Sequence, residues 1–130
     1  MTLVEFLNAR LDEDEAIARA ATDGPWGATP GPWGPEATYL EAVDGWDFAV
    51  FETVKDARHA ARHDPARVLA EVAAKRKIVE EHPIRKSGDE EGCECNYDRE
   101  WGWAEEGACG TLRALTSVYA GHPDYDPTWR

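Results

Sequence analysis

The sequence predicts an α+β fold, in which a small antiparallel sheet packs against three or four helices and a long loop carries the cysteines. Apolar residues recur at helical spacing near the start and in two later stretches. Between them, at about 37–53, residue types that favour strands flank the turn signal Asp44-Gly45. A chain of 130 residues has the commonest size of a single domain, so we expect one domain spanning 1–130.

The helices begin at recognisable caps. Thr2 and Glu5 have the spacing of a capping box, which predicts a helix over about 3–21. Thr53 and Asp56 repeat that spacing and begin a short helix that ends near His63. Asp64-Pro65 then has the residue types of an N-cap and first helical position, and opens a helix to about 81. A last helix is expected over about 111–120, before a glycine and a proline.

The sheet is expected to form around one hairpin at about 37–53. Asp44-Gly45 predicts a two-residue turn between its strands. A lone hairpin is marginally stable in water, so it must pack on helices or recruit a third strand. We expect that strand from around Trp33, and we expect the first helix and the two later ones to pack on the sheet.

A short repeat, Gly-Pro-Trp-Gly, occurs at 24–27 and again at 31–34. Its prolines and glycines exclude helix, while Trp26 and Trp33 offer large apolar anchors. One interpretation is a loop pinned to the core by two indoles. The other makes Trp26 and Trp33 an exposed binding pair for a proline-rich peptide or a ligand ring.

The charge pattern argues against direct nucleic-acid binding. The net charge is −12, although Arg58 to Lys86 contains eight basic residues and four acids. The rest of the chain carries 22 acids and six basic residues, and such an acidic body is repelled by phosphate backbones. We therefore interpret the basic stretch as a solvated helix that compensates the acidic remainder.

Composition also bears on the compartment. No stretch approaches the roughly 18 consecutive apolar residues of a membrane span, so we expect no membrane association. The segment 1–10 lacks the basic end and apolar middle of a secretory signal, and we expect a cytoplasmic protein. In that setting three cysteines are thiols or metal ligands rather than a disulfide framework.

The cysteines form the constellation best suited to chemistry. Cys93, Cys95 and Cys109, with His82 ahead of them, supply the sulfur and imidazole donors of a four-ligand structural zinc site. Their spacing departs from the familiar pattern, because Cys-x-Cys is rarer than Cys-x-x-Cys. Two other interpretations stay open. The thiols can be small core groups without a special role, or Cys109 can be a nucleophile activated by a helix N-terminus and a nearby histidine.

His59 and His63 lie four residues apart, which places both on one helical face. The accompanying glutamate of zinc hydrolases is missing, so surface or capping roles are expected there. The sequence also contains no Walker loop, dinucleotide fingerprint or Gly-x-Ser-x-Gly elbow, which lowers the expectation of nucleotide-using enzymes and serine hydrolases.

Several motifs together resemble a family of small proteins from actinobacteria and their phages that is defined by a domain of unknown function. They are the stretch 7–15, the turn 29–33, His-Asp-Pro-Ala-Arg-Val-Leu at 63–69 continuing to 74–76, Cys109 with Thr-Leu-Arg-Ala-Leu at 111–115, and Tyr-Ala-Gly-His-Pro-Asp-Tyr at 119–125 with Trp129. The resemblance spans nearly the whole chain. It implies no catalytic residues, because the family has no established activity. The resemblance also implies a Cys-x-x-Cys-like pair ahead of the last cysteine, where this chain has Cys93-x-Cys95.

We therefore expect a non-enzymatic accessory or regulatory protein of phage or prophage origin that acts through a protein partner and holds one structural zinc ion. An alternative is a thiol- or metal-dependent enzyme that uses Cys93, Cys95 and Cys109. A third is a nucleic-acid-associated protein, or an acidic mimic of nucleic acid. The partner and the oligomeric state do not follow from the sequence.

Overall fold

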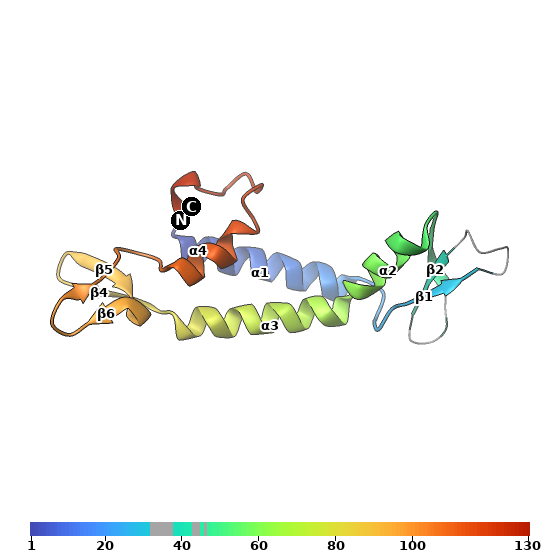
Figure 1. Ribbon diagram of the computed structural model, residues 1–130, viewed down its shortest axis with the longest axis horizontal. Helices are drawn as coiled ribbons and strands as arrows, with labels where there is room; N and C mark the ends of the chain where they lie inside the picture. Colours follow the sequence, from blue (N-terminus) through green and yellow to red (C-terminus); the bar gives the residue numbers. More distant parts are fainter. Residues whose placement is uncertain (32–37, 43–44, 46) are drawn as a thin grey trace. The chain divides into compact units, whose positions relative to one another are not determined.

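The computed structural model describes residues 1–31, 38–42, 45 and 47–130 (Figure 1). The chain divides into two units. The cysteine unit comprises Met1–Asp12 and Ala73–Arg130, and the sheet unit comprises Glu13–Val72. The predicted α+β class is confirmed. Among the described residues, no helix has both the length and the apolar character needed to cross a bilayer.

The predicted helices are present with small changes in their ends. The helices of the described residues are α1 (Leu3–Ala20), α2 (Val54–Arg62), α3 (Pro65–Glu81) and α4 (Gly110–Ser117), with short 3-10 turns η1 (Glu94–Asn96) and η2 (Pro127–Trp129). The strands are β1 (Gly27–Pro30), β2 (Thr38–Glu41), β3 (Asp47–Phe51), β4 (Ile84–Ser87), β5 (Glu90–Cys93), β6 (Tyr97–Asp98) and β7 (Gly102–Trp103).

The predicted caps are made by side chains. The backbone N–H of Glu5 donates to Thr2 Oγ1 at 3.2 Å, and that of Thr2 donates back to Glu5 Oε2 at 2.7 Å. Thr53 Oγ1 accepts from the N–H of Asp56 at 3.1 Å. Asp64 Oδ1 accepts from the N–H of Arg67 at 2.9 Å. These bonds satisfy N–H groups that the first turn of a helix leaves without a helical partner, which explains why each helix begins where it does.

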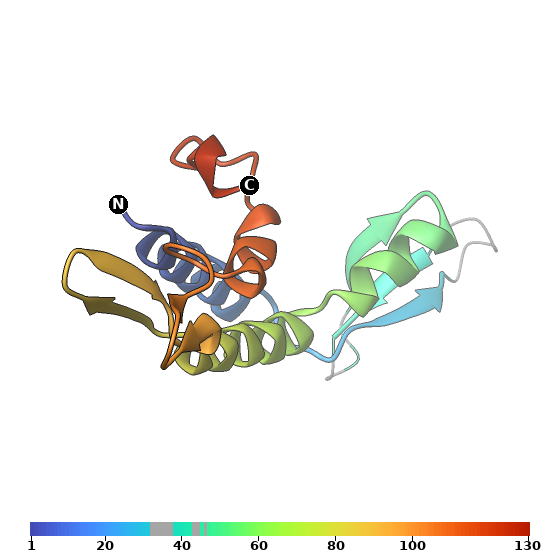
Figure 2. The same cartoon turned by 60° about the vertical axis from the view of Figure 1, so that its left-hand side comes forward.

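The sheet unit contains an antiparallel sheet in the order β1-β2-β3. Helix α2 packs against all three strands (Figure 2). Ala57 on α2 is fully buried, and Leu40 on β2 is nearly so. A third strand is present as Gly27–Pro30, just ahead of the segment around Trp33 from which it was expected. Trp33 itself lies outside the described residues.

The predicted two-residue turn at Asp44-Gly45 lies only partly within the described residues. The pair of β2 and β3 nearest this turn joins Glu41 to Asp47, and the register shifts between Leu40 and Glu41. Gly45 has φ +78°, the left-handed conformation that favours glycine. Asp44 lies outside the described residues.

In the cysteine unit, α1 contributes the largest buried side chains. Phe6, Leu7 and Leu11 are fully buried. The Phe6 ring packs against Tyr125 and Trp129, with centroids 5.9 and 5.1 Å apart, so the C-terminal tail closes over the start of α1. Within this unit, the beginning of α1 runs beside the end of α3 in the opposite direction (Figures 1 and 2). Arg76 Nη2 donates to Asp12 Oδ1 across that pair at 2.6 Å.

The long cysteine-containing segment between α3 and α4 holds two short hairpins, β4-β5 and β6-β7. Their sequences are mostly polar and lack the alternation of a half-buried strand, so local sequence does not reveal them. Long-range contacts organise this segment. One of them is the Trp103 indole, which lies so close to Gly92 on β5 that a side chain there would overlap it.

Asp64 makes two hydrogen bonds that can be removed together. Its second oxygen, Oδ2, accepts from the backbone N–H of Trp26 at 3.1 Å, which ties the segment before β1 to the start of α3. We expect Asp64→Ala to lower the free energy of unfolding by about 2 kcal/mol, because it removes a cap and leaves a half-buried N–H unpaired. Urea denaturation measures this change. Thr53→Ala is the control: it removes an exposed cap alone, and an effect as large as that of Asp64→Ala would contradict the interpretation.

Candidate metal centre

His82, Cys93, Cys95 and Cys109 come together in the cysteine unit. His82 directly follows α3, Cys93 is the last residue of β5, Cys95 lies in η1, and Cys109 precedes α4. The β4-β5 register contributes to this arrangement, because Ile84 pairs with Cys93 and brings that thiol close to His82 two residues earlier. The backbone N–H of Glu94 extends the pairing by donating to the carbonyl of Pro83 at 2.9 Å.

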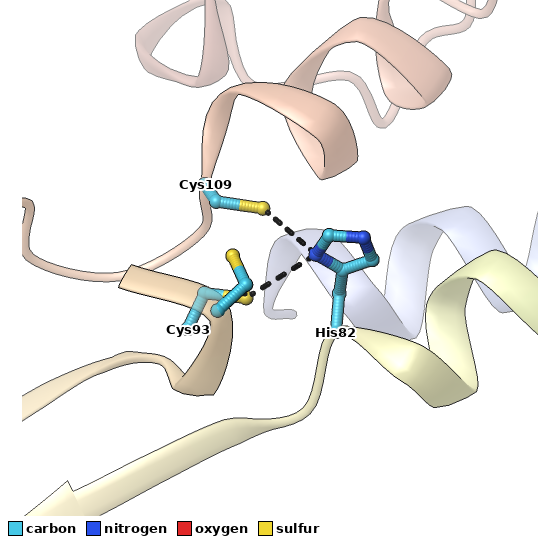
Figure 3. A group of neighbouring side chains, drawn as sticks. His82, Cys93 and Cys109 are labelled. Atoms are coloured by element: carbon cyan, nitrogen blue, oxygen red, sulfur yellow. Dashed lines mark hydrogen bonds between the residues drawn. The ribbon is translucent and has the colours of Figure 1, made fainter. Parts of the chain in front are cut away.

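The four side chains offer one ligand atom each, and these atoms all lie within 4.8 Å of one another. His82 Nδ1 is 3.7 Å from Cys93 Sγ and 3.5 Å from Cys109 Sγ. Figure 3 shows both contacts meeting at the same ring nitrogen. Cys95 Sγ is 3.1 Å from Cys93 Sγ. The cluster is therefore tight enough for one metal ion to reach all four atoms.

Burial differs among the thiols. Cys93 and Cys109 are buried within a cluster that includes Leu3 and Leu112, whereas Cys95 is exposed at the outer side. Although the residue is exposed, desolvation of its thiol and the neighbouring thiols of Cys93 and Cys109 raise the pKa of Cys95 to about 12. Burial also raises the pKa of Cys109, but backbone N–H groups of Leu112 and Thr111 at the start of α4 and the other two thiols outweigh it, and the pKa falls to about 7. A thiolate is thus favoured at the helix N-terminus.

Backbone contacts hold the ends of the cysteine-containing segment together. The N–H of Gly107 donates to the carbonyl of Glu91 at 2.9 Å, and Gly92 and Gly107 form an isolated bridge. This pairing places residue 107, two positions before Cys109, beside the strand that ends at Cys93. The first hydrogen bond of α4, from Arg113 N–H to the carbonyl of Cys109 at 3.0 Å, orients the last thiol.

A pocket of about 610 Å³ lies beside the cluster. Its walls include Leu3, Val79, Ile84 and Trp129, and His82 lines it as well. None of the three cysteines is among its lining residues. The thiols therefore do not open onto this pocket, an arrangement that suits a structural centre better than a thiol presented to substrate.

The other residues singled out by sequence lie in the sheet unit. Trp26 is half-buried; its ring packs on Phe48 with centroids 4.9 Å apart, and Nε1 donates to the carbonyl of Thr22 at 2.8 Å. Trp26 thus acts as an anchor of its own loop, and its binding role stays a prediction. The rings of His59, on α2, and His63, directly after it, contact each other at a tilt of 49° with centroids 4.7 Å apart. Both residues are exposed, and neither belongs to the four-residue cluster.

Two residues of the site were not singled out from the sequence. Gly92 and Trp103 meet where the two hairpins join, and a Cβ at Gly92 would lie 2.3 Å from Cγ of Trp103. The glycine immediately before Cys93 was the available signal, since glycine often marks close approach of another group to the backbone. Nothing in the local sequence shows that Trp103 is the group that approaches.

Fold and cluster together define a small α+β protein with one histidine and three cysteines gathered as potential metal ligands. The family of unknown function DUF6221 matches the whole chain, residues 1–130. The chain belongs to this family, which confirms the resemblance to a domain of unknown function. Searches of curated proteins and of solved structures found no match.

The contact between Gly92 and Trp103 can be tested directly. We expect Gly92→Ala to lower the free energy of unfolding by about 2 kcal/mol, because the new methyl group overpacks against the indole. Chemical denaturation followed by tryptophan fluorescence measures the loss. Gly121→Ala is a matched control, since a Cβ at Gly121 meets nothing within 4 Å. Equal stability of the two variants would contradict the packing described here.

Proposed function

We propose that this protein is a non-enzymatic accessory or regulatory protein of phage or prophage origin that binds another protein in the cytoplasm. Its cysteine unit is held by one structural zinc ion on His82, Cys93, Cys95 and Cys109. The observation that carries the proposal is the convergence of these four side chains, from separate elements, within 4.8 Å.

The distances support a tetrahedral ion. With Zn–S near 2.3 Å and Zn–N near 2.0–2.1 Å, tetrahedral geometry separates sulfur from nitrogen by about 3.6 Å. The two measured separations from His82 Nδ1, to Cys93 and to Cys109, are 3.7 and 3.5 Å. Sulfur and imidazole donors are also the ligands that zinc takes in structural sites. Small adjustments of the Cys95 side chain would complete the shell.

A structural role is favoured because the four donors fill all four positions of such an ion, whereas catalytic zinc keeps one position for water or substrate. The pocket lining supports this as well, since it includes His82 but none of the thiols. The ion would hold together a segment whose β4-β5 hairpin contains few apolar residues. In such a segment, metal binding energy replaces the hydrophobic burial that would otherwise stabilise the fold.

Binding of a protein rather than nucleic acid is supported by the charges. Within the described part of the chain, carboxylates pair with four of the eight basic residues between Arg58 and Lys86. The pairs are Arg67 with Glu71, Arg76 with Asp12, Arg85 with Glu94, and Lys86 with Glu91. Cations that are neutralised within the protein contribute little to attraction of phosphate groups, and the net charge of −12 opposes such contact.

The metal content can be counted by native mass spectrometry of protein purified without chelator. We expect one zinc ion per chain, absent from Cys93→Ser and from His82→Ala. His59→Ala removes an exposed histidine outside the cluster and should keep the ion. Cobalt loaded in place of zinc should show the absorption of a tetrahedral thiolate site. Three free thiols with no bound metal, in protein refolded with zinc, would contradict the proposal.

Chelation measures the contribution of the ion to stability. When free zinc exceeds the dissociation constant about 1,000-fold, binding to the native state alone adds about 4 kcal/mol to the free energy of unfolding. We therefore expect a chelator to lower the melting temperature of the wild-type protein and to leave that of Cys93→Ser unchanged. Equal melting curves for wild type with and without chelator would contradict a structural role.

A further inference from the structure

The β6-β7 hairpin presents an exposed tryptophan on an ordered tip. The side chain of Trp101 is 82% exposed, the most exposed of the large apolar residues among those described. Asp98 Oδ1 accepts from the N–H groups of Glu100 and Trp101 at 2.7 and 3.0 Å, and Gly102 has φ +78°. These bonds organise the turn. Trp101 is therefore held outward by a defined turn instead of packing on its own unit.

Contacts at the base of the hairpin fix its direction. Tyr97 and Trp103 pack with ring centroids 5.0 Å apart, and Trp103 also packs against Gly92. The N–H of Ala104 donates to the carbonyl of Asn96 at 3.1 Å, which closes the hairpin directly beyond Cys95. The ligand cluster thus lies at the root of the hairpin, and Trp101 lies at its tip.

The surroundings of this tip are strongly acidic. From Asp89 to Glu106 the chain has eight acids and one base, Arg99. Glu91 and Glu94 pair with cations of β4 at 3.2 Å. The remaining six are exposed and make no ion pair within the described residues. They are Asp89, Glu90, Asp98, Glu100, Glu105 and Glu106.

We propose that this hairpin surface, Trp101 with the unpaired acids Asp98 and Glu100 of its turn and Glu90 beside Gly102, is the docking site for a cationic segment of a partner protein. The inference rests on the proposed function, whose partner it characterises. Tryptophan is enriched among residues that dominate binding energy, because its large ring loses much water-exposed area on contact. Lysine or arginine beside an apolar residue would neutralise the unpaired acids and stack on the indole face.

The negative charge of this hairpin favours a cationic peptide over the other kinds of ligand that contact exposed tryptophans. Single-stranded nucleic acids stack bases on aromatic side chains, but they do so along positively charged grooves. Anionic membrane surfaces likewise attract basic segments. Six unpaired acids against one base in this segment repel both. A cationic peptide is the ligand for which the aromatic tip and the charge act together.

A random twelve-residue peptide library displayed on phage and selected on the full-length, zinc-loaded protein tests the proposal. We expect the enriched peptides to combine lysine or arginine with an apolar residue. One of them, made synthetically, should bind Trp101→Ala at least tenfold more weakly, with affinity that falls as salt is added. Val118→Ala is the matched control: it truncates another exposed apolar side chain of the same unit, 67% exposed, and should bind normally.

Any one of three results would contradict the proposed docking site. They are a selection without enrichment, enriched peptides that are acidic or neutral, or peptides that bind Trp101→Ala as tightly as wild type. Tighter binding of a twelve-nucleotide oligothymidine than of any enriched peptide would overturn it too. Trp101→Ala should melt at the wild-type temperature, because its side chain is almost entirely in solvent.

Zinc content separates failure of this inference from failure of the proposed function. Native mass spectrometry is run on each protein used in the selection. Zinc present with no Trp101-dependent binding removes the docking site and leaves the structural ion. Trp101-dependent binding by a chain that holds no zinc keeps the docking site and removes the ion.

Discussion

The contact of the His82 imidazole with the thiols of Cys93 and Cys109 is the constraint on which the cysteine unit depends. It joins the end of α3, the end of β5 and the start of α4, three points that are far apart in the sequence. Each of these elements has another reason to be where it is. Leu3 and Leu112 bury the thiols from one side, and the β4-β5 register brings Cys93 near His82. Core packing and strand register therefore position the same side chains, which have the donor atoms of a metal site.

The two hairpins between α3 and α4 depend on contacts at and beside this cluster. Their strands are short, those of β4-β5 are mostly polar, and isolated hairpins of this kind are marginal in water. Trp103 packed on Gly92 supplies part of what the local sequence lacks, and an ion bound at Cys93, Cys95 and Cys109 would supply more. This packing leaves Trp101 exposed at the tip. A rigid base and an exposed aromatic tip are suited to binding a partner at low cost in conformational entropy.

The sheet unit depends more on local interactions than the cysteine unit does. Its elements are defined by local signals, such as the caps at Thr53 and Asp64, and by burial of Ala57 against the strands. Trp26 fits the same pattern, because its backbone bonds Asp64 and its ring covers Phe48. The loop is pinned by side chains where regular backbone pairing ends.

The sequence by itself determined the class of fold, the four principal helices, the caps of the first three, and the identity of the four candidate ligands. These features depend on interactions within a few residues, or on donor chemistry that is visible in residue type. Only the tertiary structure decided the third strand at Gly27–Pro30 and the hairpins beside the cluster. It also decided that Trp101, rather than Trp26, is the most exposed large apolar side chain among the described residues. Strand partners and side-chain exposure depend on contacts between distant residues, which no local pattern encodes.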